Sequence, residues 1–170
     1  MVPAKSGAWI DSAAQTCRSE RLEQVASNMN IDEVSIRFAT LADLEFVQQD
    51  GFVSAGIVER KIEQREVIVA EWNSEPIGYM RLEYLWSSIP YIALIRIVPE
   101  YRRRGVGKAI LHFAETFLRD RGHNALYSSS QANEPEPQSW HRHVGFEECG
   151  FIAGINRGGI GEVFFRKRLV

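Results

Sequence analysis

One segment in the middle of the chain joins an apolar strand to a helix through a basic turn with two glycines, Arg102-Arg103-Arg104-Gly105-Val106-Gly107-Lys108. Glycine has no Cβ atom, so the backbone at Gly105 and Gly107 can come close to an anion. The unpaired amides of the first helical turn point at such an anion, and the basic side chains add positive charge. The turn is therefore predicted to hold a pyrophosphate.

The residues after this turn are predicted to form a helix with one buried face. Their apolar side chains recur at the spacing of helical turns, at Val106, Ala109, Ile110, Phe113, Ala114, Phe117 and Leu118. Polar residues fall on the other face, and Gly122 follows where a left-handed C-cap belongs. His112 is accordingly expected at the solvated surface.

Two other glycine motifs bind phosphates but differ from this one in spacing. A P-loop has four residues between its first glycine and Gly-Lys-Ser/Thr, whereas Gly105 and Gly107 are one residue apart and Ala109 follows the lysine. A Rossmann turn has a third glycine where Ile110 stands, and a second βαβ unit. The pattern that remains is R-x-x-G-x-G.

This R-x-x-G-x-G pattern follows a strand and Val98-Pro99-Glu100-Tyr101, and it resembles the GNAT superfamily of acetyl-CoA-dependent N-acetyltransferases. The likeness extends from about Val34 to Leu169 and includes Gly145-Phe146 after a short helix. It implies one α/β (α+β) domain over residues 34–170, with a mixed, mostly antiparallel sheet of about six to seven strands flanked by helices. Residues 1–33 would form an extension of unresolved role.

Composition agrees with one soluble domain: 170 residues, 45% of them hydrophobic, suit a single core. The net charge of -2 gives no general attraction to nucleic acid or to an anionic membrane, and no apolar run is long enough to cross a bilayer. Cys17 and Cys149 are too few for a disulfide framework, which indicates a reducing cytoplasm. Cys149 is expected to pack as a small buried residue.

The remaining elements follow from period and turn signals. Strands are predicted over 34–38, 67–72, 77–86, 125–130, 147–153 and 162–169, and helices from Thr40, over 56–64 and over 137–144. Residues 73–76 are expected to reverse the chain into a hairpin. In the strand that follows, Tyr79, Arg81 and Glu83 share one face, which could line a cleft.

The resemblance assigns acetyl-CoA as cosubstrate and places the pantetheine arm beside the strand before the turn, at Ile95, Ile97 and Val98. A backbone amide can pair with an extended amide-bearing chain as a sheet edge accepts a strand, so apolar residues are adequate there and can pack in the core as well. Asn133 matches a residue that often contacts the same arm in the family.

Members of the family frequently have a tyrosine four residues before the glycine that corresponds to Gly145. The hydroxyl of this tyrosine can protonate the leaving thiolate. This chain has His141 at that position. An imidazolium can donate a proton, but its ordinary pKa is about 6.5 against about 10 for tyrosine. His141 therefore either replaces the tyrosine as catalytic acid or packs and hydrogen-bonds within its helix, with Tyr127 and Tyr101 as other donors.

Glu83 also has two interpretations. It is either a cross-strand partner of Arg81 or Arg96 on a solvated sheet face or the proton acceptor for the incoming amine. His141 and His143 do not predict a metal site, because residues two apart on a helix face different directions and no acidic or cysteine ligand follows at chelating spacing.

Together these residues predict transfer of an acetyl group to a primary amine of a small molecule or peptide. The transfer is direct, in a ternary complex, and the amide of Ile97 or Val98 polarises the thioester oxygen. Two alternatives remain open, a protein N-terminal or lysine acetyltransferase and a non-catalytic acyl-CoA-binding regulator. A homodimer is suggested by family resemblance alone, and no nucleic acid, membrane or metal partner is expected.

Overall fold

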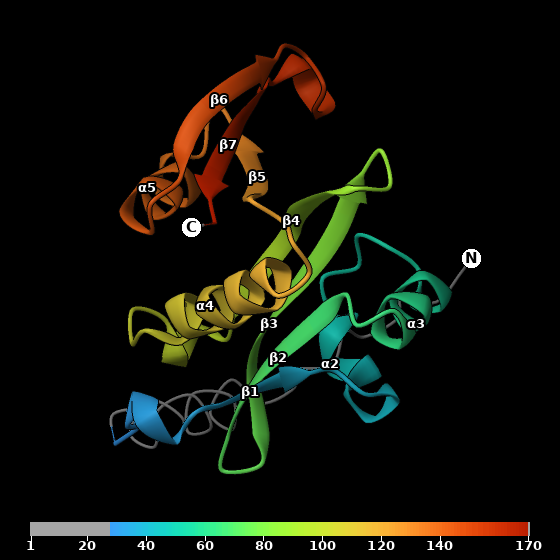
Figure 1. Ribbon diagram of the computed structural model, residues 1–170, viewed down its shortest axis with the longest axis vertical. Coiled ribbons are helices and arrows are strands. Elements are labelled where there is room, and N and C mark those ends of the chain that lie inside the picture. Colours follow the sequence, from blue (N-terminus) through green and yellow to red (C-terminus); the bar gives the residue numbers. More distant parts are fainter. Residues whose placement is uncertain (1–27, 170) are drawn as a thin grey trace, which may run out of the picture.

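The computed structural model describes residues 28–169, which form a seven-stranded sheet flanked by helices (Figure 1). The strands are β1 (Ser35–Phe38), β2 (Val67–Trp72), β3 (Glu75–Leu85), β4 (Ile89–Ile97), β5 (Ala125–Gln131), β6 (Glu147–Ile152) and β7 (Glu162–Arg168). The α-helices are α2 (Leu44–Val47), α3 (Ala55–Glu63), α4 (Val106–Arg119) and α5 (Pro135–His143), joined by the short 3-10 turns η1 (Ile31–Glu33), η2 (Leu41–Asp43), η3 (Pro99–Tyr101) and η4 (Arg157–Gly159).

The sheet is mixed and mostly antiparallel, as predicted. Its order is β1-β2-β3-β4-β5-β7-β6, and β4 and β5 are the only neighbours that run parallel within the described residues. The long connection between these two strands contains α4. A crossover helix of this kind is what a parallel pair requires.

The hairpin between β2 and β3 is tighter than the sequence indicated. Asn73 and Ser74 both have left-handed backbones, with φ of 50° and 63°, and complete the reversal alone. Such a two-residue turn matches the twist of the flanking strands. Pro76, predicted in the turn, therefore lies in β3, beside the irregularity at Ala70 and Glu71.

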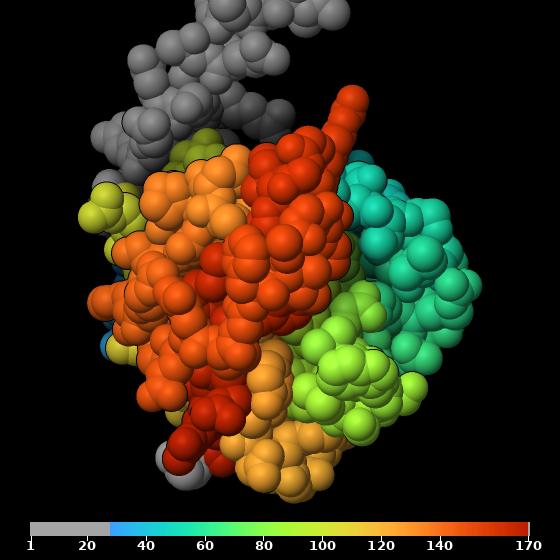
Figure 2. Space-filling model, turned by 90° about the horizontal axis from the view of Figure 1, so that it is seen from above, coloured from blue at the N-terminus to red at the C-terminus, as the bar shows by residue number. Residues whose placement is uncertain are grey.

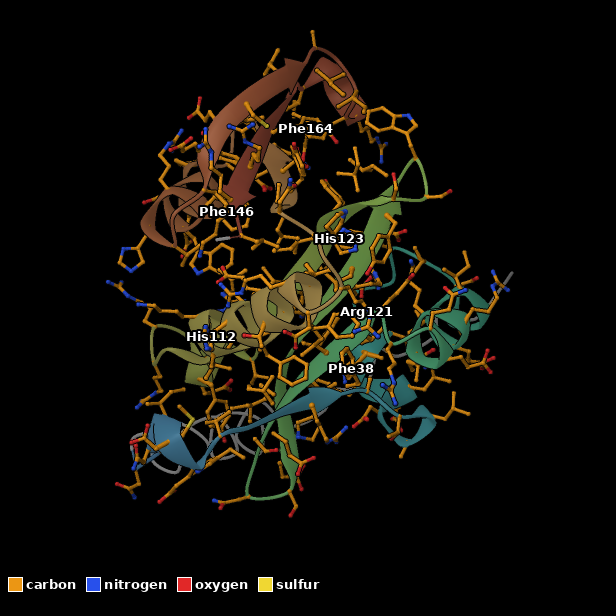
Figure 3. The ribbon with its side chains drawn as sticks, viewed as in Figure 1. Phe38, His112, Arg121, His123, Phe146 and Phe164 are labelled. Carbon is orange, nitrogen blue, oxygen red and sulfur yellow. The ribbon has the colours of Figure 1, made fainter. Side chains whose placement is uncertain are left out.

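Helix α4 covers one face of the sheet and forms the main core with it. Its residues Val106, Ile110 and Leu118 are buried together with Ile68 and with other sheet residues that point the same way, Met80, Leu82, Ile92 and Phe165. His112, labelled on α4 in Figure 3, is exposed as predicted. The amphipathic pattern of this segment thus fixes which side faces the sheet.

Helices α2 and α3 cover the other face, where a second core contains Val47, Val58, Ile62 and Tyr79. The loop between these helices is tied to the sheet by a buried ion pair, Arg81 Nη1 to Asp50 Oδ2 at 3.1 Å. Tyr79 Oη also donates to Asp50 Oδ2, at 2.8 Å. Both side chains are almost fully buried, so this ion pair is shielded from water.

Strand β6 forms one edge of the sheet, and all of its residues are exposed. Cys149 is therefore exposed, and the expectation that it is buried is wrong, because β6 is an edge strand that pairs only with β7 among the described strands. Figure 2 shows these C-terminal segments, in orange and red, next to the light-green tip of the β3–β4 hairpin.

The predicted extension, residues 1–33, lies mostly outside the described residues. Its described end contacts the core, because Trp72 Nε1 donates to Glu33 Oε2 at 3.3 Å and Met29 packs against the main core. Within residues 28–169, no helix is both long and apolar enough to cross a membrane.

Candidate active site

Strands β4 and β5 lie side by side over a short stretch and then diverge. Their parallel pairing comprises Tyr91 with Tyr127 and Ile92 with Ser128. Beyond these pairs β4 continues to Ile97 along β3, while β5 continues along β7 (Figure 1). The C-terminal half of β4 therefore has one edge that no strand of the described residues pairs.

The direction of the β4 amides follows from one hydrogen bond. Val98 N donates to Ile77 O at 2.9 Å, so the amide of Val98 points toward β3. Successive residues of a strand present their N–H groups to opposite edges, so the amides of Ile97 and Ile95 point to the unpaired edge of β4. The region between this edge and β5 is called the divergence below. Of the two donors expected for the thioester oxygen, Ile97 fits the geometry, Val98 is occupied by the sheet, and Ile95 is a second free donor.

The side chains of Ile95, Ile97 and Val98 are half-buried and pack against the main core. These side chains therefore pack in the core as expected, while the backbone amides on the unpaired edge of β4 remain available to a ligand. The strand bulges at Ala93, because Arg81 pairs with Leu94 while Leu82 pairs with Ile92. A bulge of this kind increases the local twist and helps the two strands separate.

The basic turn leads from β4 into the N-terminus of α4. Gly105 is the N-cap, with φ of 90°, and the first helical bond runs from Ala109 N to Gly105 O at 2.9 Å. The three amides before Ala109 therefore have no acceptor in the helix, and they form a place for an anion at the positive end of the helix dipole.

The arginines of the turn have two different roles. Arg102 Nε donates to Ile97 O at 3.1 Å, and Arg104 Nε donates to Glu100 O at 3.2 Å, so both hold the turn in shape. Arg103 and Lys108 are exposed and carry charge near the helix N-terminus. Arg103 also has a left-handed backbone, with φ of 60°.

Gly107 lies between Ile95 of β4 and Trp140 of α5. A Cβ atom placed there would meet Ile95 Cδ1 and Trp140 Cζ2 at 3.7 Å each, which is ordinary contact. Because glycine lacks this atom, its backbone stays bare between the two side chains, which suits the close approach of a ligand. The free amides, the helix N-terminus and this bare backbone suit an extended chain that ends in a pyrophosphate.

The β5 side of the divergence carries Asn133 and Trp140. Asn133 is exposed in the turn between β5 and α5, and Gln138 fixes that turn by donating to Gln131 O at 3.0 Å. Trp140 comes from α5, and its ring lies 3.7 Å from the position that a Cβ atom of Gly107 would take. Sequence reasoning missed Trp140, because no local pattern places an α5 side chain against α4.

His141 lies at the closed end of the divergence. It is 4% exposed, its ring stacks on Phe165 with centroids 4.7 Å apart, and its Nε2 is 2.8 Å from Ser128 Oγ. Ser128 in turn donates to Ile92 O, so we assign Nε2 of His141 as the protonated nitrogen. Burial lowers the pKa of His141 to about 4. The geometry favours the packed, hydrogen-bonded role over that of a proton donor.

Glu83 lies on the opposite face and pairs with a helix rather than across the sheet. Its Oε2 is 2.9 Å from Lys61 Nζ, which also contacts Glu66 Oε2 at 3.0 Å. Arg81, one of its expected partners, belongs instead to Asp50. Glu83 stands directly opposite Tyr91 in the β3–β4 register, so its carboxylate lies next to the phenol.

A polar chain that the sequence did not indicate lies beside Glu83, formed by Tyr91, Ser129 and Glu162 from three strands. The alternation of side chains along a strand could have assigned each of these residues to one face of the sheet. It could not have shown that β7 pairs with β5, which brings Glu162 to this place. Among residues 28–169, no cluster of three or more His, Cys, Asp or Glu residues is arranged to hold a metal ion.

Comparison with known proteins identifies the family of this chain. Residues 20–146 match the model of the acetyltransferase (GNAT) family. The chain is 26% identical over 142 residues to an aminoglycoside N(6')-acetyltransferase type 1 of Stenotrophomonas maltophilia, covering 84% of this chain and 74% of that protein. It is 24% identical over 98 residues to streptothricin acetyltransferase of Streptomyces lavendulae, covering 56% and 51%.

Solved structures share the fold. Ard1 from Thermoplasma volcanium superposes with a TM-score of 0.72 at 14% identity, covering 81% of this chain and 99% of that one. The acetyltransferase yncA from Salmonella typhimurium, solved with its cofactor acetyl-CoA, superposes with a TM-score of 0.68 at 18% identity, covering 81% and 95%.

Proposed function

This chain belongs to the GNAT acetyltransferase family, and from that premise we propose that it transfers an acetyl group from acetyl-CoA directly to a primary amine of a small molecule or peptide. The observation that carries the proposal is the divergence of β4 from β5, which frees the amides of Ile95 and Ile97 in line with the N-terminus of α4. An extended, amide-bearing chain ending in a pyrophosphate fits that arrangement.

In this proposal the two ends of acetyl-CoA are held by different groups. The amides of Ile95 and Ile97 pair with the pantetheine arm, Val98 packs beside them, and Asn133 contacts the arm from the turn after β5. The pyrophosphate is held by the amides at the start of α4 and by the basic turn, Arg102, Arg103, Arg104, Gly105, Val106, Gly107 and Lys108.

Acetyl-CoA supplies a thioester, whose carbonyl carbon is the electrophile. Of the amides of Ile95 and Ile97, the one that lies nearer the thioester donates to its carbonyl oxygen instead of to the arm, and stabilises the negative charge that develops on that oxygen. The nitrogen–carbon bond forms, the carbon–sulfur bond breaks with its electron pair on sulfur, and the amine loses a proton. The amides that donate to the carbonyl oxygen are fixed in a half-buried strand, where a hydrogen bond is stronger than in water.

Two side chains remain as proton-transfer candidates from the sequence. Glu83, the acceptor expected from the sequence, lies on the face away from α4, where Lys61 already compensates its charge. His141 as an acid requires an imidazolium, which is scarce at neutral pH when burial lowers its pKa to about 4. The sulfur would then take its proton from water.

The choice of a small-molecule or peptide amine is supported by the relatives. An aminoglycoside and a streptothricin acetyltransferase both act, by their names, on amine-bearing small molecules. The chain spans about half the length of the second of these.

Calorimetric titration with acetyl-CoA and CoA tests the proposal first. A free-thiol assay on the same sample follows, with kanamycin, spermidine and a hexapeptide that has a free amino terminus. We expect binding of both nucleotides and thiol release that depends on one of the amines. Binding without any release would favour the acyl-CoA-binding regulator, and an absence of binding would contradict the proposed site.

A further inference from the structure

Three polar side chains from three strands form one hydrogen-bonded chain on the sheet face away from α4. Tyr91 Oη lies 2.6 Å from Ser129 Oγ, and Ser129 Oγ donates to Glu162 Oε1. Asn156 Nδ2 donates to the other carboxylate oxygen, Glu162 Oε2, at 2.7 Å. Their neighbours Ile92, Ser128 and Phe165 are buried toward α4, so alternation along each strand sets this chain on the opposite face.

The donors of this chain have a fixed order. An ionised carboxylate only accepts, so the hydroxyl proton of Ser129 points at Glu162. Ser129 Oγ then has only lone pairs to offer toward Tyr91, and the phenol must donate to it. The proton order is Tyr91 to Ser129 to Glu162, which leaves the lone pairs of Tyr91 Oη free to accept a further hydrogen bond.

Glu162 differs from Glu83, a carboxylate on the same face. Glu83 is paired with Lys61, whereas none of the ion pairs within residues 28–169 includes Glu162. Glu162 is held by neutral groups alone, the Ser129 hydroxyl and the Asn156 amide. Its negative charge is therefore available to a cation that arrives from outside the protein.

Tyr91 lies at the closed end of the divergence, in the direction in which an arm held by Ile97 and Ile95 would run from α4. It belongs to the first of the two β4–β5 pairs, and the free amides of Ile95 and Ile97 follow on the same strand. Its ring packs against Phe164 of β7, labelled in Figure 3, with centroids 6.3 Å apart. The phenol oxygen thus lies at the closed end of the divergence, between β4, β5 and β7.

We propose that Glu162 positions Tyr91, through Ser129, to receive a proton from the incoming ammonium group, so that this enzyme acetylates amines that arrive as cations. The inference rests on the proposed function and names the substrate class of that site. Glu162 and Ser129 are positioning residues, and Tyr91 is the group that touches the acceptor.

The proton step balances within this chain. The ammonium nitrogen gives one proton to Tyr91 Oη, the phenol proton passes to Ser129, and the Ser129 proton passes to Glu162, which becomes a neutral acid. The amine then has a free electron pair to attack the thioester carbon. Glu162 returns its proton to water after the acetylated product leaves.

The surroundings of Tyr91 keep the phenol protonated, as a relay requires. Burial has the largest effect and raises the pKa of Tyr91, the hydrogen bond with Ser129 lowers it, and the charges of Glu162 and Glu83 raise it. The charge of Glu162 also acts on His141 of α5, and Arg166 shares the face of Glu162 on β7, opposite Tyr127. Lys61 of α3 is paired with Glu83 and Glu66.

The test compares wild type with Glu162→Gln, Tyr91→Phe and Ser129→Ala, using kanamycin, spermidine and the hexapeptide at pH 6.5 to 9.5. Glu59→Gln, an exposed carboxylate on α3, is the matched control. We expect Glu162→Gln to lower kcat/KM at least about tenfold at pH 7 and less at pH 9.5, where more of the amine is already neutral. Acetyl-CoA affinity should stay within about twofold, because these side chains do not contact the basic turn.

The double variant Glu162→Gln with Tyr91→Phe should lose no more activity than the worse single variant, because one chain acts as a unit. An unchanged Glu162→Gln rate, or a loss equal at every pH, would overturn the inference while leaving the transferase activity standing. A pH-dependent loss in Glu83→Gln alone would assign the acceptor to Glu83 instead. If wild type acetylates none of the three amines, the proposed function fails first and the inference with it.

Discussion

The two sides of the β4–β5 divergence are built in different ways. The cosubstrate side is one continuous segment, in which β4, the basic turn and the start of α4 offer mainly backbone amides. The acceptor side is assembled from side chains of distant segments, Tyr91, Ser129 and Glu162 among them. Backbone recognition tolerates many sequences, whereas a side-chain relay depends on each of its members.

The largest effect is expected on the acceptor side, from Asp50→Ala. This change leaves Arg81 buried without a partner, which should lower the free energy of unfolding by about 3–5 kcal/mol. Chemical denaturation measures it, with the exposed Asp32→Ala as control. If the variant is folded at low temperature, acetyl-CoA should still bind, because the cosubstrate side does not use this pair. A parallel loss of binding would show that the two sides are not separate.

His141→Phe probes the closed end, where the two sides meet. The pKa of His141 falls from its ordinary 6.5 to about 4 on folding, so the unfolded chain binds more protons between these values. Wild-type stability should therefore drop as the pH falls from 6.5 to 4, by up to about 3 kcal/mol. His141→Phe should not show this loss of stability between pH 6.5 and 4.

The same variant decides the role of His141 in catalysis. We expect an unchanged pH profile of kcat, since a neutral imidazole supplies no acid. A profile that loses its acidic limb in His141→Phe would restore the assignment of His141 as proton donor. Denaturation at matched pH values separates this outcome from a loss of folded protein.

On the cosubstrate side, Gly107→Val should weaken acetyl-CoA binding at least about tenfold, or about 1.4 kcal/mol, because the branched side chain occupies the surface meant for the ligand. Gly56→Val is the matched control, since Gly56 is likewise the second residue of a helix and has open space around it. Titration calorimetry on both variants isolates the ligand effect from helix propensity. Equal affinities would count against the proposed site.

The smallest effect is expected from Arg103→Ala. The side chain is exposed, so its attraction to a phosphate is screened and should change acetyl-CoA affinity only about two- to fivefold. The change should shrink further at high salt. Arg60→Ala, exposed on α3, serves as the control with equal loss of charge. A loss above about a hundredfold would show that Arg103 is buried against the ligand.

The sequence predicted the cosubstrate side well because its signals are local. The amphipathic spacing from Val106 to Leu118 fixed the buried face of α4, and the glycines marked its start. The same local reasoning misjudged the extent of the Asn73 turn, since it could not weigh left-handed backbones against the usual place of Pro76. It also expected Cys149 to be buried, which depends on whether another element covers β6.

The acceptor side was not predictable in this way, because its members meet only after the strands are ordered. Glu83 was expected to pair with Arg81 or Arg96, yet the packing of α3 gives it Lys61 and gives Arg81 to Asp50. Glu162 reaches Ser129 because β7 inserts between β5 and β6. No spacing in the chain carries that information.

The sequence by itself determined the strand, turn and helix that are proposed to hold acetyl-CoA, because hydrophobic period, glycine and charge act within about twenty residues. Tertiary structure alone decided which β4 amides are free, since β5 must first pair at Tyr91 and Ile92 and then leave. It alone also decided that His141 is buried with a lowered pKa and that Glu162 has no ion pair within residues 28–169. Those properties depend on neighbours distant in sequence, which set solvent exposure and charge compensation.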